Sequence, residues 1–508
     1  MVESRFGGSV FALFLTLVAG CGSASSPASF GADSDGGATS TSGSSGNGSA
    51  PPLVGTGTGT TSAGGGSCTG LACQVHSCSG GGSTTLSGTI FDPAGKNPLY
   101  NIGVFVPNEA PKPMPDGVTC DCNSLYTGDP IASALTDAAG HFTLQNVPDG
   151  ANVPLVIQVG KWRMQTTIAN VTACQDNPQP NGKLRLPKNH SEGDIPNIAI
   201  STGGADSLEC LLHRVGLDDA EYGPAGSGAG HIHIFQGAGI AGASTPTPTP
   251  TPIPIPIPLP PGTVGGGFSL GAAPNTSPSA PASSAQLWDS KSDLLKYDLV
   301  LLSCEGQETA SMTQQALFDY AAAGGRVFAS HFHYAWFNSG PFGAANLASW
   351  TTGSNDMGSI NATIDTSFPK GAALSQWLGN VGALTGGELP IQQARHNANV
   401  SSANTASQAW IAADKSATPA GATEYFTFNT PIGVPADQQC GRVVYSDLHV
   451  GAASGDYGAS ASAPIVPSGC ASGGLSPQEK ALEFMLFDLA SCVQQESVPP
   501  MPPPPVPR

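Results

Sequence analysis

The sequence has few charged residues, few aromatic residues and, after its first twenty residues, no long apolar run. Charged residues make up 11% and aromatic residues 7% of its 508 positions. The sequence has 18 basic and 36 acidic residues, which gives a formal net charge of −18. This charge argues against a nucleic-acid partner, because its phosphates would be repelled. No later segment has the roughly 18 consecutive apolar residues of a transmembrane helix. The glycine-rich motifs that bind nucleotide phosphates are also missing, so we expect no nucleotide ligand.

The start of the chain has the pattern of an export signal. Arg5 supplies a basic flank, and the apolar run Val10–Ala19 is too short to span a bilayer. The sequence L-V-A-G-C, Leu17–Cys21, resembles the lipobox of bacterial lipoproteins. This resemblance implies cleavage before Cys21, lipidation of its sulfur, and anchoring to the bacterial cell membrane or outer membrane, facing outward or the periplasm. The alternative is an ordinary secretory signal with a cysteine there by chance.

Eleven of the 12 cysteines follow Cys21. In the oxidising compartment that export implies, most should pair as disulfides, and because eleven is odd one should stay free or bond another chain. The five nearest the N-terminus could instead hold zinc, although their spacing matches no standard zinc ribbon. The disulfide candidates are Cys68, Cys73, Cys78, Cys120, Cys122, Cys174, Cys210, Cys304, Cys440, Cys470 and Cys492.

Glycine and proline are abundant, with 66 and 45 residues, so much of the chain should be spacer, and the rest suffices for about two domains. After the signal peptide 1–20, residues 21–83 are rich in Gly, Ser and Thr and predict a flexible tether. Short β-type runs then alternate with turn residues through 84–200.

The β-type runs resemble a known domain. S-G-T-I-F-D-P-A-G (Ser87–Gly95), T-D-A-A-G-H-F-T-L (Thr136–Leu144) and V-P-D-G (Val147–Gly150) are similar to the carboxypeptidase regulatory-like domain, a transthyretin-like or Cna-B-like β-sandwich. Asp137 and Gly140 should make a tight hairpin turn. The resemblance implies an all-β sandwich that serves as a spacer, pedestal or adhesive surface and has no enzymatic activity.

From about residue 205 helical and strand-like segments alternate, which predicts a parallel sheet covered on both faces within 205–494. Tyr297–Gly306 and Gly441–Val450 have the pattern of buried strands, and Gly324–Phe337 begins as a strand and runs out into two histidines.

A proline-rich insertion, 244–285, interrupts this domain, and a proline-rich tail, 495–508, follows it. Alternate prolines favour an extended polyproline II rod that leaves and re-enters the domain as a spacer, with docking of an external domain as the alternative. The domain should close with a helix that has Ser476 as N-cap and Pro477 at its first position.

Polar residues cluster where the predicted strands end. In a doubly wound sheet, ligands bind beyond the carboxyl ends of the strands. Those ends carry the candidate site residues Glu305, His331, His333, Asp447 and His449. Their imidazole and carboxylate groups could hold a metal ion or act as acid and base near neutral pH. The histidines at 331 and 333 are separated by one phenylalanine, so both could face one side of a strand.

These strands resemble the class I glutamine amidotransferase-like fold, in particular its trehalose-utilisation-type branch, where Y-D-x-V-x-x-S, G-G-x-V-x-x-x-H and G-R-V-x-Y strands recur in this order. The resemblance implies a flavodoxin-like domain with His331 in place of the nucleophilic cysteine, and with Asp447 and His449 near the catalytic histidine and glutamate. A-S-H-F-H replaces the G-x-C-x-G elbow, so neither its strained turn nor acyl-enzyme chemistry is expected. Cys304 also ends a strand, but a different one, and the sequence identifies no base beside it.

These patterns predict a multidomain chain with an all-β sandwich, an α/β flavodoxin-like parallel-sheet domain, and long disordered Gly/Ser-rich and Pro-rich segments. They favour a non-catalytic binding or structural role at the cell envelope, without a cofactor, towards a glycan or protein partner. The alternative is a metal-dependent hydrolase of extracellular sugars or amides that holds one zinc or iron ion at the polar cluster. Aromatic residues that suit stacking on sugars, although they more often fill a core, are Tyr334, Trp336, Phe337, Trp350 and Trp377.

Overall fold

The computed structural model describes residues 68–502, apart from 121–124, 204, 227, 229, 238–280, 311–313, 451–469 and 471–472, and all of them belong to one compact unit. The predictions for Cys21, for the tether up to residue 67, for Cys122 and for most of the proline-rich insertion lie outside the described residues. None of the helices in the described ranges is both long and apolar enough to cross a membrane.

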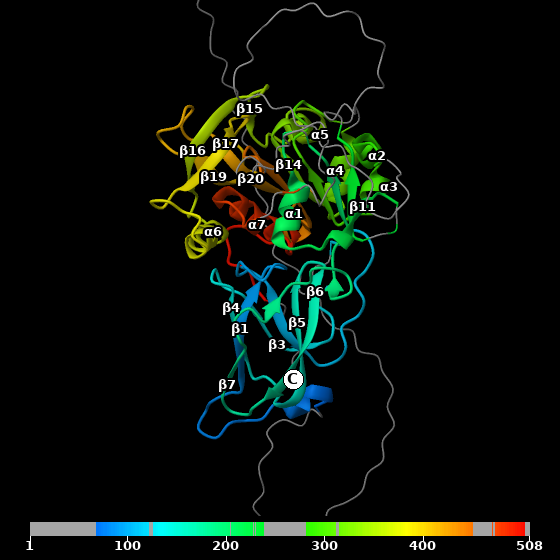
Figure 1. Ribbon diagram of the computed structural model, residues 1–508, viewed down its shortest axis with the longest axis vertical. Helices are drawn as coiled ribbons and strands as arrows, with labels where there is room; N and C mark the ends of the chain where they lie inside the picture. The colour runs from blue at the N-terminus through cyan, green and yellow to red at the C-terminus, as the bar shows by residue number, and fades with distance from the viewer. Residues whose placement is uncertain are drawn as a thin grey trace, which may run out of the picture. The chain divides into compact units, whose positions relative to one another are not determined.

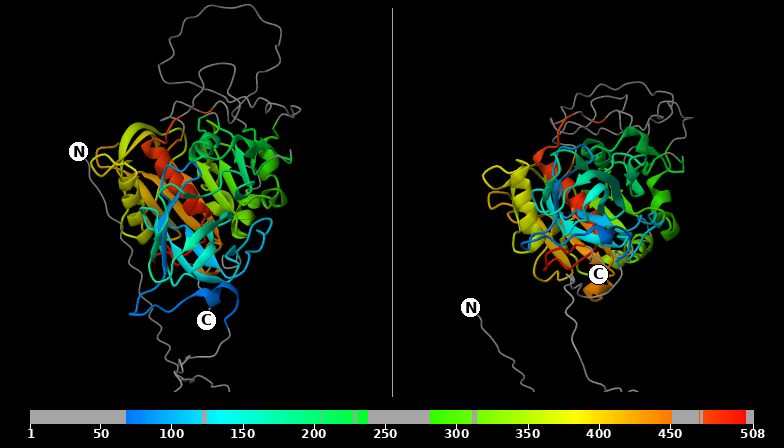
Figure 2. Two further views of the ribbon diagram at one scale, coloured as in Figure 1. Left: turned by 60° about the horizontal axis from the view of Figure 1, so that its bottom comes forward. Right: turned by 90° about the horizontal axis from the view of Figure 1, so that it is seen from below.

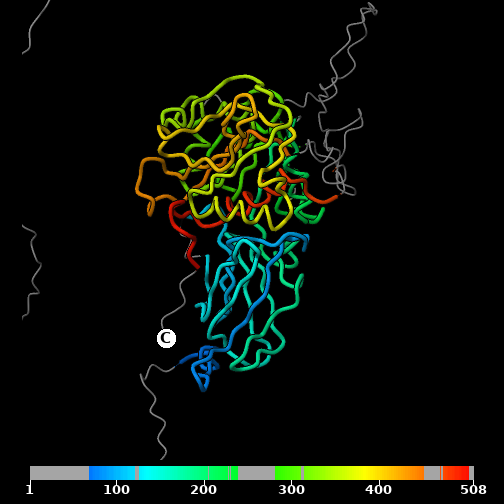
Figure 3. Tube along the Cα trace, turned by 90° about the vertical axis from the view of Figure 1, so that its left-hand side faces the viewer, coloured from blue at the N-terminus to red at the C-terminus, as the bar shows by residue number. Residues whose placement is uncertain are grey.

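The first part of the described chain forms two small sheets with one apolar core (Figure 1). Figure 3 traces them as the blue-to-cyan part of the tube. One sheet consists of β4 (His141–Gln145), β1 (Thr85–Phe91), β7 (Asp176–Pro178) and β8 (Leu184–Arg185). The other has the order β3 (Pro130–Leu135), β2 (Gly103–Pro107), β5 (Gly150–Val159), β6 (Trp162–Val171) and β9 (Gly193–Asp194). Leu86 and Leu144 from the first sheet and Val104 and Leu155 from the second are fully buried in the shared core, as in a β-sandwich.

Asp137 and Gly140 form the predicted turn, but the turn does not make a hairpin. The Gly140 N–H donates to the Asp137 carbonyl at 2.9 Å, and the Asp137 carboxylate accepts from the N–H groups of Ala139 and His141. Gly140 has φ +74°, a conformation that glycine adopts without strain. The turn joins β3 to β4, which lie in different sheets, so it carries the chain across the sandwich.

The rest of the chain is built on a ten-stranded mixed sheet (Figure 2). Its parallel part has the order β11 (Tyr222–Pro224), β12 (Ile232–Phe235), β10 (Ile198–Ser201), β13 (Leu299–Leu302), β14 (Arg326–Ser330) and β21 (Gly441–Ser446). Its antiparallel part continues with β20 (Thr423–Thr430), β19 (Ser407–Ala413), β16 (Asp356–Ile364) and β17 (Leu389–Arg395). A further two-stranded sheet pairs β15 (Ser349–Trp350) with β18 (Ala398–Asn399).

The prediction of a wholly parallel sheet is therefore wrong for residues 356–430. These strands are antiparallel, and most of β16 is exposed or half-buried, so it lacks the continuous apolar run by which buried parallel strands are recognised. The predicted parallel strands at β13, β14 and β21 are present as neighbours.

Helices cover both faces of the large sheet. Along β13, Leu299 and Leu301 belong to one apolar core, and Val300 and Leu302 belong to the other. Helices of the first core are α1 (Leu208–Val215), α6 (Pro369–Asn380) and α7 (Pro477–Ala490). Helices of the second core are α2 (Ser284–Trp288), α3 (Lys291–Leu294), α4 (Gln315–Ala322) and α5 (Gly340–Gly343). The short 3₁₀ helices are η1 (Gly70–Gln74), η3 (Asp219–Glu221), η4 (His331–Trp336) and η5 (Ala436–Gln438).

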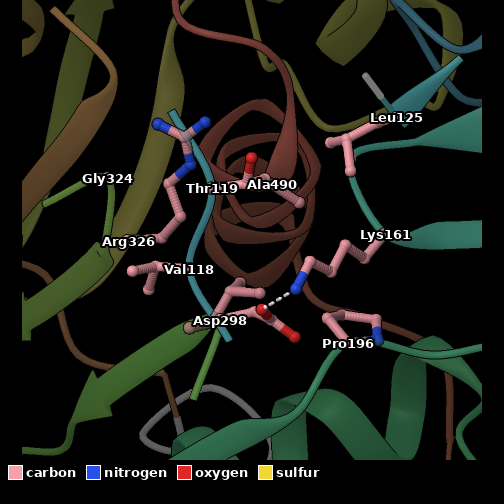
Figure 4. A pocket seen from close by; sticks show the side chains of 11 residues that line it. Val118, Thr119, Leu125, Lys161, Pro196, Asp298, Gly324, Arg326 and Ala490 are labelled. Atoms are coloured by element: carbon pink, nitrogen blue, oxygen red, sulfur yellow. Dashed lines mark hydrogen bonds and ion pairs between the residues drawn. The ribbon is translucent and has the colours of Figure 1, made fainter. Parts of the chain in front are cut away.

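A buried ion pair joins the turn between β5 and β6 to the start of β13 (Figure 4). Lys161 Nζ lies 2.6 Å from Asp298 Oδ1, and Asp298 Oδ2 accepts from the Asn197 N–H at 2.8 Å. The pair borders a cavity of about 40 Å³ that Thr119 and Arg326 also line, with room for only a few water molecules. The sandwich and the large sheet are thus connected by polar as well as apolar contacts.

The described cysteines are mostly paired. The disulfides are Cys68–Cys73, Cys78–Cys174, Cys120–Cys440 and Cys210–Cys470. Cys492 is also disulfide-bonded, and Cys304 is free and buried. Among the described cysteines this confirms the prediction of paired cysteines with one free thiol, and it overturns the zinc alternative for Cys68, Cys73, Cys78 and Cys120. Such pairing is typical of proteins in an oxidising compartment outside the cytosol.

Candidate functional site

The candidate site lies at the carboxyl ends of three neighbouring parallel strands. Cys304 and Glu305 follow β13, His331 follows β14, and Asp447 and His449 follow β21. β14 pairs with β13 on one side and with β21 on the other. This topology brings segments more than a hundred residues apart in the chain to one edge of the sheet.

The structure brings together Cys304, His331 and His449. Cys304 Sγ lies 3.3 Å from His331 Nδ1, and the rings of His331 and His449 are 5.0 Å apart between centroids. One donor atom from each of the three residues lies within 4.8 Å of the others. All three side chains are buried. We call this group the buried trio.

Hydrogen bonding and burial keep the thiol and the imidazole beside it neutral. His331 Nε2 donates to the Ser354 carbonyl at 3.0 Å, so in the neutral ring Nδ1 is free to accept from the Cys304 thiol. Burial raises the pKa of Cys304 to about 12 and, helped by the positive charge of Arg395, lowers the pKa of His331 to about 3. The pair is therefore a thiol and a neutral imidazole over the physiological pH range, and not a thiolate and an imidazolium.

His331 is the first residue of η4 and makes a strained turn directly after β14, which the sequence did not predict. Its φ of +42° is left-handed, a conformation that costs a residue with a side chain about 1–3 kcal/mol. Tyr445 Oη donates to its carbonyl at 2.9 Å, and the preceding Ser330 Oγ donates to Asp206. Asp206 also accepts from the Val450 N–H at 2.7 Å, which ties the turn to the end of β21. The expectation that no strained turn exists here is wrong, because neighbouring contacts hold the turn without flanking glycines.

His333 does not join the buried trio. Sequence alternation placed it on the same face as His331, but β14 ends at Ser330 and the chain turns into η4, which sends the two rings in different directions. His333 Nε2 donates to the Ser303 carbonyl at 2.9 Å, and its ring packs edge-on against Trp288. Burial lowers the pKa of His333, and the nearby Glu305 carboxylate opposes that shift.

Asp447 and Glu305 also lie outside the buried trio. Asp447 Oδ2 accepts from the N–H groups of Asn397 and Ala398, both at 2.8 Å, and Oδ1 lies 2.7 Å from Tyr445 Oη. Burial raises the pKa of Asp447 to about 7. Its oxygens thus hold a loop in place. The Glu305 carboxyl group packs against Gly237, where an added Cβ would lie 2.8 Å from Glu305 Cδ and only 2.1 Å from the Thr202 carbonyl oxygen, so only glycine fits there.

The two ring nitrogens of His449 have different surroundings. Its Nδ1 lies 3.4 Å from Gln393 Oε1, whereas its Nε2 is buried and has no hydrogen-bond partner among the described residues. Burial lowers the pKa of His449 well below its usual value, and the positive charge of Arg395 adds to the shift. A neutral imidazole with a free lone pair is the form that binds metal ions.

The donor set of the buried trio fits a soft divalent metal. Thiolate and imidazole are both zinc ligands, three of them would leave the fourth position open, and a bound cation would deprotonate the thiol. Sequence reasoning set Cys304 aside because it follows another strand. The order of the strands, which makes β13 and β14 neighbours, is the information that would have identified it.

Most of the aromatic residues considered for sugar stacking fill the core instead. Tyr334, Trp336, Phe337 and Trp377 are fully buried, and only Trp350 is half-buried. The four buried rings therefore offer no surface for a glycan.

Comparisons with known proteins assign neither a family nor a function. No family model matches the chain, and no curated protein matches it. Two crystal structures of interface mutants of a type II cohesin–X–dockerin complex from Acetivibrio cellulolyticus cover 27% of this chain, and 74% and 85% of their own chains, at 17% and 16% identity, with TM-scores of 0.14 and 0.16. A 9R-lipoxygenase from Cyanothece PCC8801 covers 21% of this chain and 16% of its own at 18% identity, with a TM-score of 0.13. Similarities this weak carry no argument about this chain.

Proposed function

We propose that this chain is an exported, lipid-anchored protein of the cell envelope with a binding or structural role and no catalytic one. In this proposal the sandwich is a carboxypeptidase regulatory-like module, and the large-sheet domain is an amidotransferase-like domain that has lost its nucleophile. The strained turn at His331 supports the second assignment, because it occupies the position where such a domain carries its nucleophile, between a strand and a helix. The partner would be an envelope glycan or protein.

One observation carries the non-catalytic part of the proposal. A cysteine nucleophile works as a thiolate, which enzymes obtain by lowering its pKa with a nearby cation or helix terminus. Here burial raises the pKa of Cys304 to about 12, and His331, the base beside it, is buried and neutral. Among the residues that the structure describes, the one thiol near a base is thus held in its unreactive form.

A metal-dependent hydrolase is the second candidate, and two features favour it. The donor atoms of Cys304, His331 and His449 converge within 4.8 Å, and His449 Nε2 lacks a hydrogen-bond partner among the described residues. When bound, zinc would supply Lewis-acid chemistry at its open position. The three side chains would hold the ion, and Ser354 and Gln393 would orient the two rings.

Elemental analysis of the oxidised full-length protein separates the two candidates. The test variant is His331→Ala/His449→Ala, and the matched control is His333→Ala, which removes a buried imidazole from outside the trio. The non-catalytic proposal expects the same metal content in all three proteins, because the buried trio holds no ion, and no hydrolysis of model amides or glycosides. About one zinc or iron per chain, lost only in the double variant and accompanied by hydrolysis that needs the metal, would overturn the proposal in favour of the hydrolase.

A further inference from the structure

A second group of polar side chains lies at the amino ends of the parallel strands, opposite the buried trio. Glu221 ends η3 and His231 immediately precedes β12, while His190 lies in the segment before β9. His231 precedes the apolar part of its strand, so it lies at the end of the strand opposite to the candidate site. The three residues come from separate segments, which the fold brings to one point.

The two histidines contact the same carboxylate. His190 Nδ1 lies 2.6 Å from Glu221 Oε1, and His231 Nδ1 lies 2.9 Å from Glu221 Oε2. The two rings are 5.3 Å apart between centroids, and one donor atom of each residue lies within 4.8 Å of the other two. One carboxylate therefore stands between two imidazole nitrogens that face each other.

The carboxylate is buried, whereas the rings are open to solvent. The Glu221 side chain is 0% exposed, compared with 56% for His190 and 30% for His231. Burial alone would raise the pKa of Glu221, but hydrogen bonds from His231 and His190 outweigh it and hold that pKa at about 2. The group is thus an anionic ligand fixed in the protein, beside two imidazoles that solvent ions can reach.

The surrounding backbone holds this arrangement in place. The His190 N–H donates to Glu221 Oε1 at 2.8 Å, which fixes the carboxylate independently of the rings. Gly230, just before His231, has φ +61°, and a Cβ there would lie 2.1 Å from the Glu221 carbonyl oxygen. Only glycine allows this close approach, and the approach places His231 beside Glu221.

We propose that His190, Glu221 and His231 bind a divalent transition metal of the zinc class at the protein surface. Two imidazoles and one carboxylate are a common zinc ligand set that leaves a position for water. Without metal, each Nδ1–H donates to the carboxylate. On binding, each Nδ1 presents a lone pair to the ion: a neutral ring keeps its single proton on Nε2, and a protonated ring releases its Nδ1 proton to solvent. The ion would crosslink the segment before β9 to the start of β12. This site is independent of the proposed function and of the buried trio.

Cobalt titration of the full-length protein tests the site, because Co²⁺ replaces zinc and reports its ligands in the visible spectrum. We expect one ion per chain at the surface site, with no thiolate-to-cobalt charge-transfer band and with the same binding in a Cys304→Ser variant. The variant His190→Gln, at a mostly exposed position, should weaken this binding at least about tenfold. The matched control is His141→Gln, also at an exposed histidine, and should bind as the wild type does.

Either of two results would overturn the proposal. One is equal cobalt affinity in the wild type and His190→Gln, and the other is binding that disappears entirely in Cys304→Ser. A rise in melting temperature on adding zinc gives a second readout. It should be present in the wild type and His141→Gln and absent in His190→Gln, and an equal rise in His190→Gln would contradict the site.

Discussion

At the scale of single residues, the candidate site depends on a backbone conformation that the sequence does not reveal. His331 follows a buried strand, and that much could be predicted from G-G-R-V-F-A-S-H. Its left-handed φ is held by contacts from Tyr445 and Ser330, of which the first comes from a strand far along the chain. The same turn separates His331 from His333 and brings His331 to Cys304. Pattern reasoning therefore found two members of the buried trio and missed the third.

The neutral state of the Cys304 thiol leads to a prediction about its reactivity. In the native protein, labelling with a disulfide reagent near pH 8 should be slower than in denaturant by roughly a thousandfold or more, because little thiolate forms at a pKa of about 12 and the sulfur is buried. The measurement is a time course of thiol release with and without denaturant. The control is Cys304→Ser, which should lose the thiol that denaturant exposes. Rapid labelling of Cys304 in the native wild type would show that the thiol is not held buried and neutral.

At the scale of elements, α7 shows what sequence patterns predict well. Its capping box joins Ser476 and Glu479, and Pro477 is its first residue, which confirms the predicted start of the helix. Such signals are local, since they depend on neighbours within one turn. By contrast, the partners of β16 and β19 are set by contacts across the sheet, so their antiparallel pairing could not be predicted from local pattern.

The contact between α7 and the end of β1 leads to a prediction about pH. Asp92 and Glu483 face each other as two buried carboxyl groups, and Asn97 Nδ2 donates to Glu483 Oε2 at 2.7 Å. Burial raises the pKa of both groups, and the nearby Asp92 raises that of Glu483 further. A folded-state pKa above the unfolded value adds stability below the unfolded pKa, and this stability is lost as pH rises through the folded pKa.

Glu483→Gln imitates the protonated form, since its amide can accept from Asn97 and donate to Asp92. Its free energy of unfolding should therefore match the wild type near pH 4 and exceed it at pH 8. The difference should grow by about 1.4 kcal/mol for each pH unit over which only the folded wild type keeps the proton. Urea unfolding at several pH values measures this, with Glu109→Gln at an exposed position as control. If the difference in free energy of unfolding between Glu483→Gln and the wild type does not change with pH, the raised pKa of Glu483 is ruled out.

At the scale of the whole molecule, the sequence predicted the two kinds of folded structure and the abundance of disulfides, but not how the two parts are joined. The ion pair of Lys161 with Asp298 and the disulfide Cys120–Cys440 both connect segments that are distant in the chain. Cysteine spacing cannot reveal such pairings, because many connectivities are compatible with one sequence.

Removing the disulfide Cys120–Cys440 should destabilise the protein strongly. The bond links residues 320 positions apart, so its loss frees a long loop in the unfolded chain, and we expect a cost of about 2–5 kcal/mol for Cys120→Ala/Cys440→Ala. The matched control is Cys68→Ala/Cys73→Ala. It removes a disulfide between residues only 5 positions apart, so it should lower the free energy of unfolding less. Thermal unfolding under oxidising conditions compares the two. An equal loss of stability in the two double variants would argue against a stabilising disulfide between Cys120 and Cys440.

The proline-rich insertion leaves and re-enters the fold at a single point. Gln236 forms a bridge with Ser283, its N–H donates to the Ala282 carbonyl, and its carbonyl accepts from the Ser284 N–H, both at 2.8 Å. Because the two ends are hydrogen-bonded to each other, the stability of the sheet should depend little on how many residues lie between them. The entropic cost of closing a loop also rises only slowly with its length. This position could accept a shorter linker, a fluorescent reporter or an entire grafted domain, which makes it the natural place to equip the molecule for imaging or display.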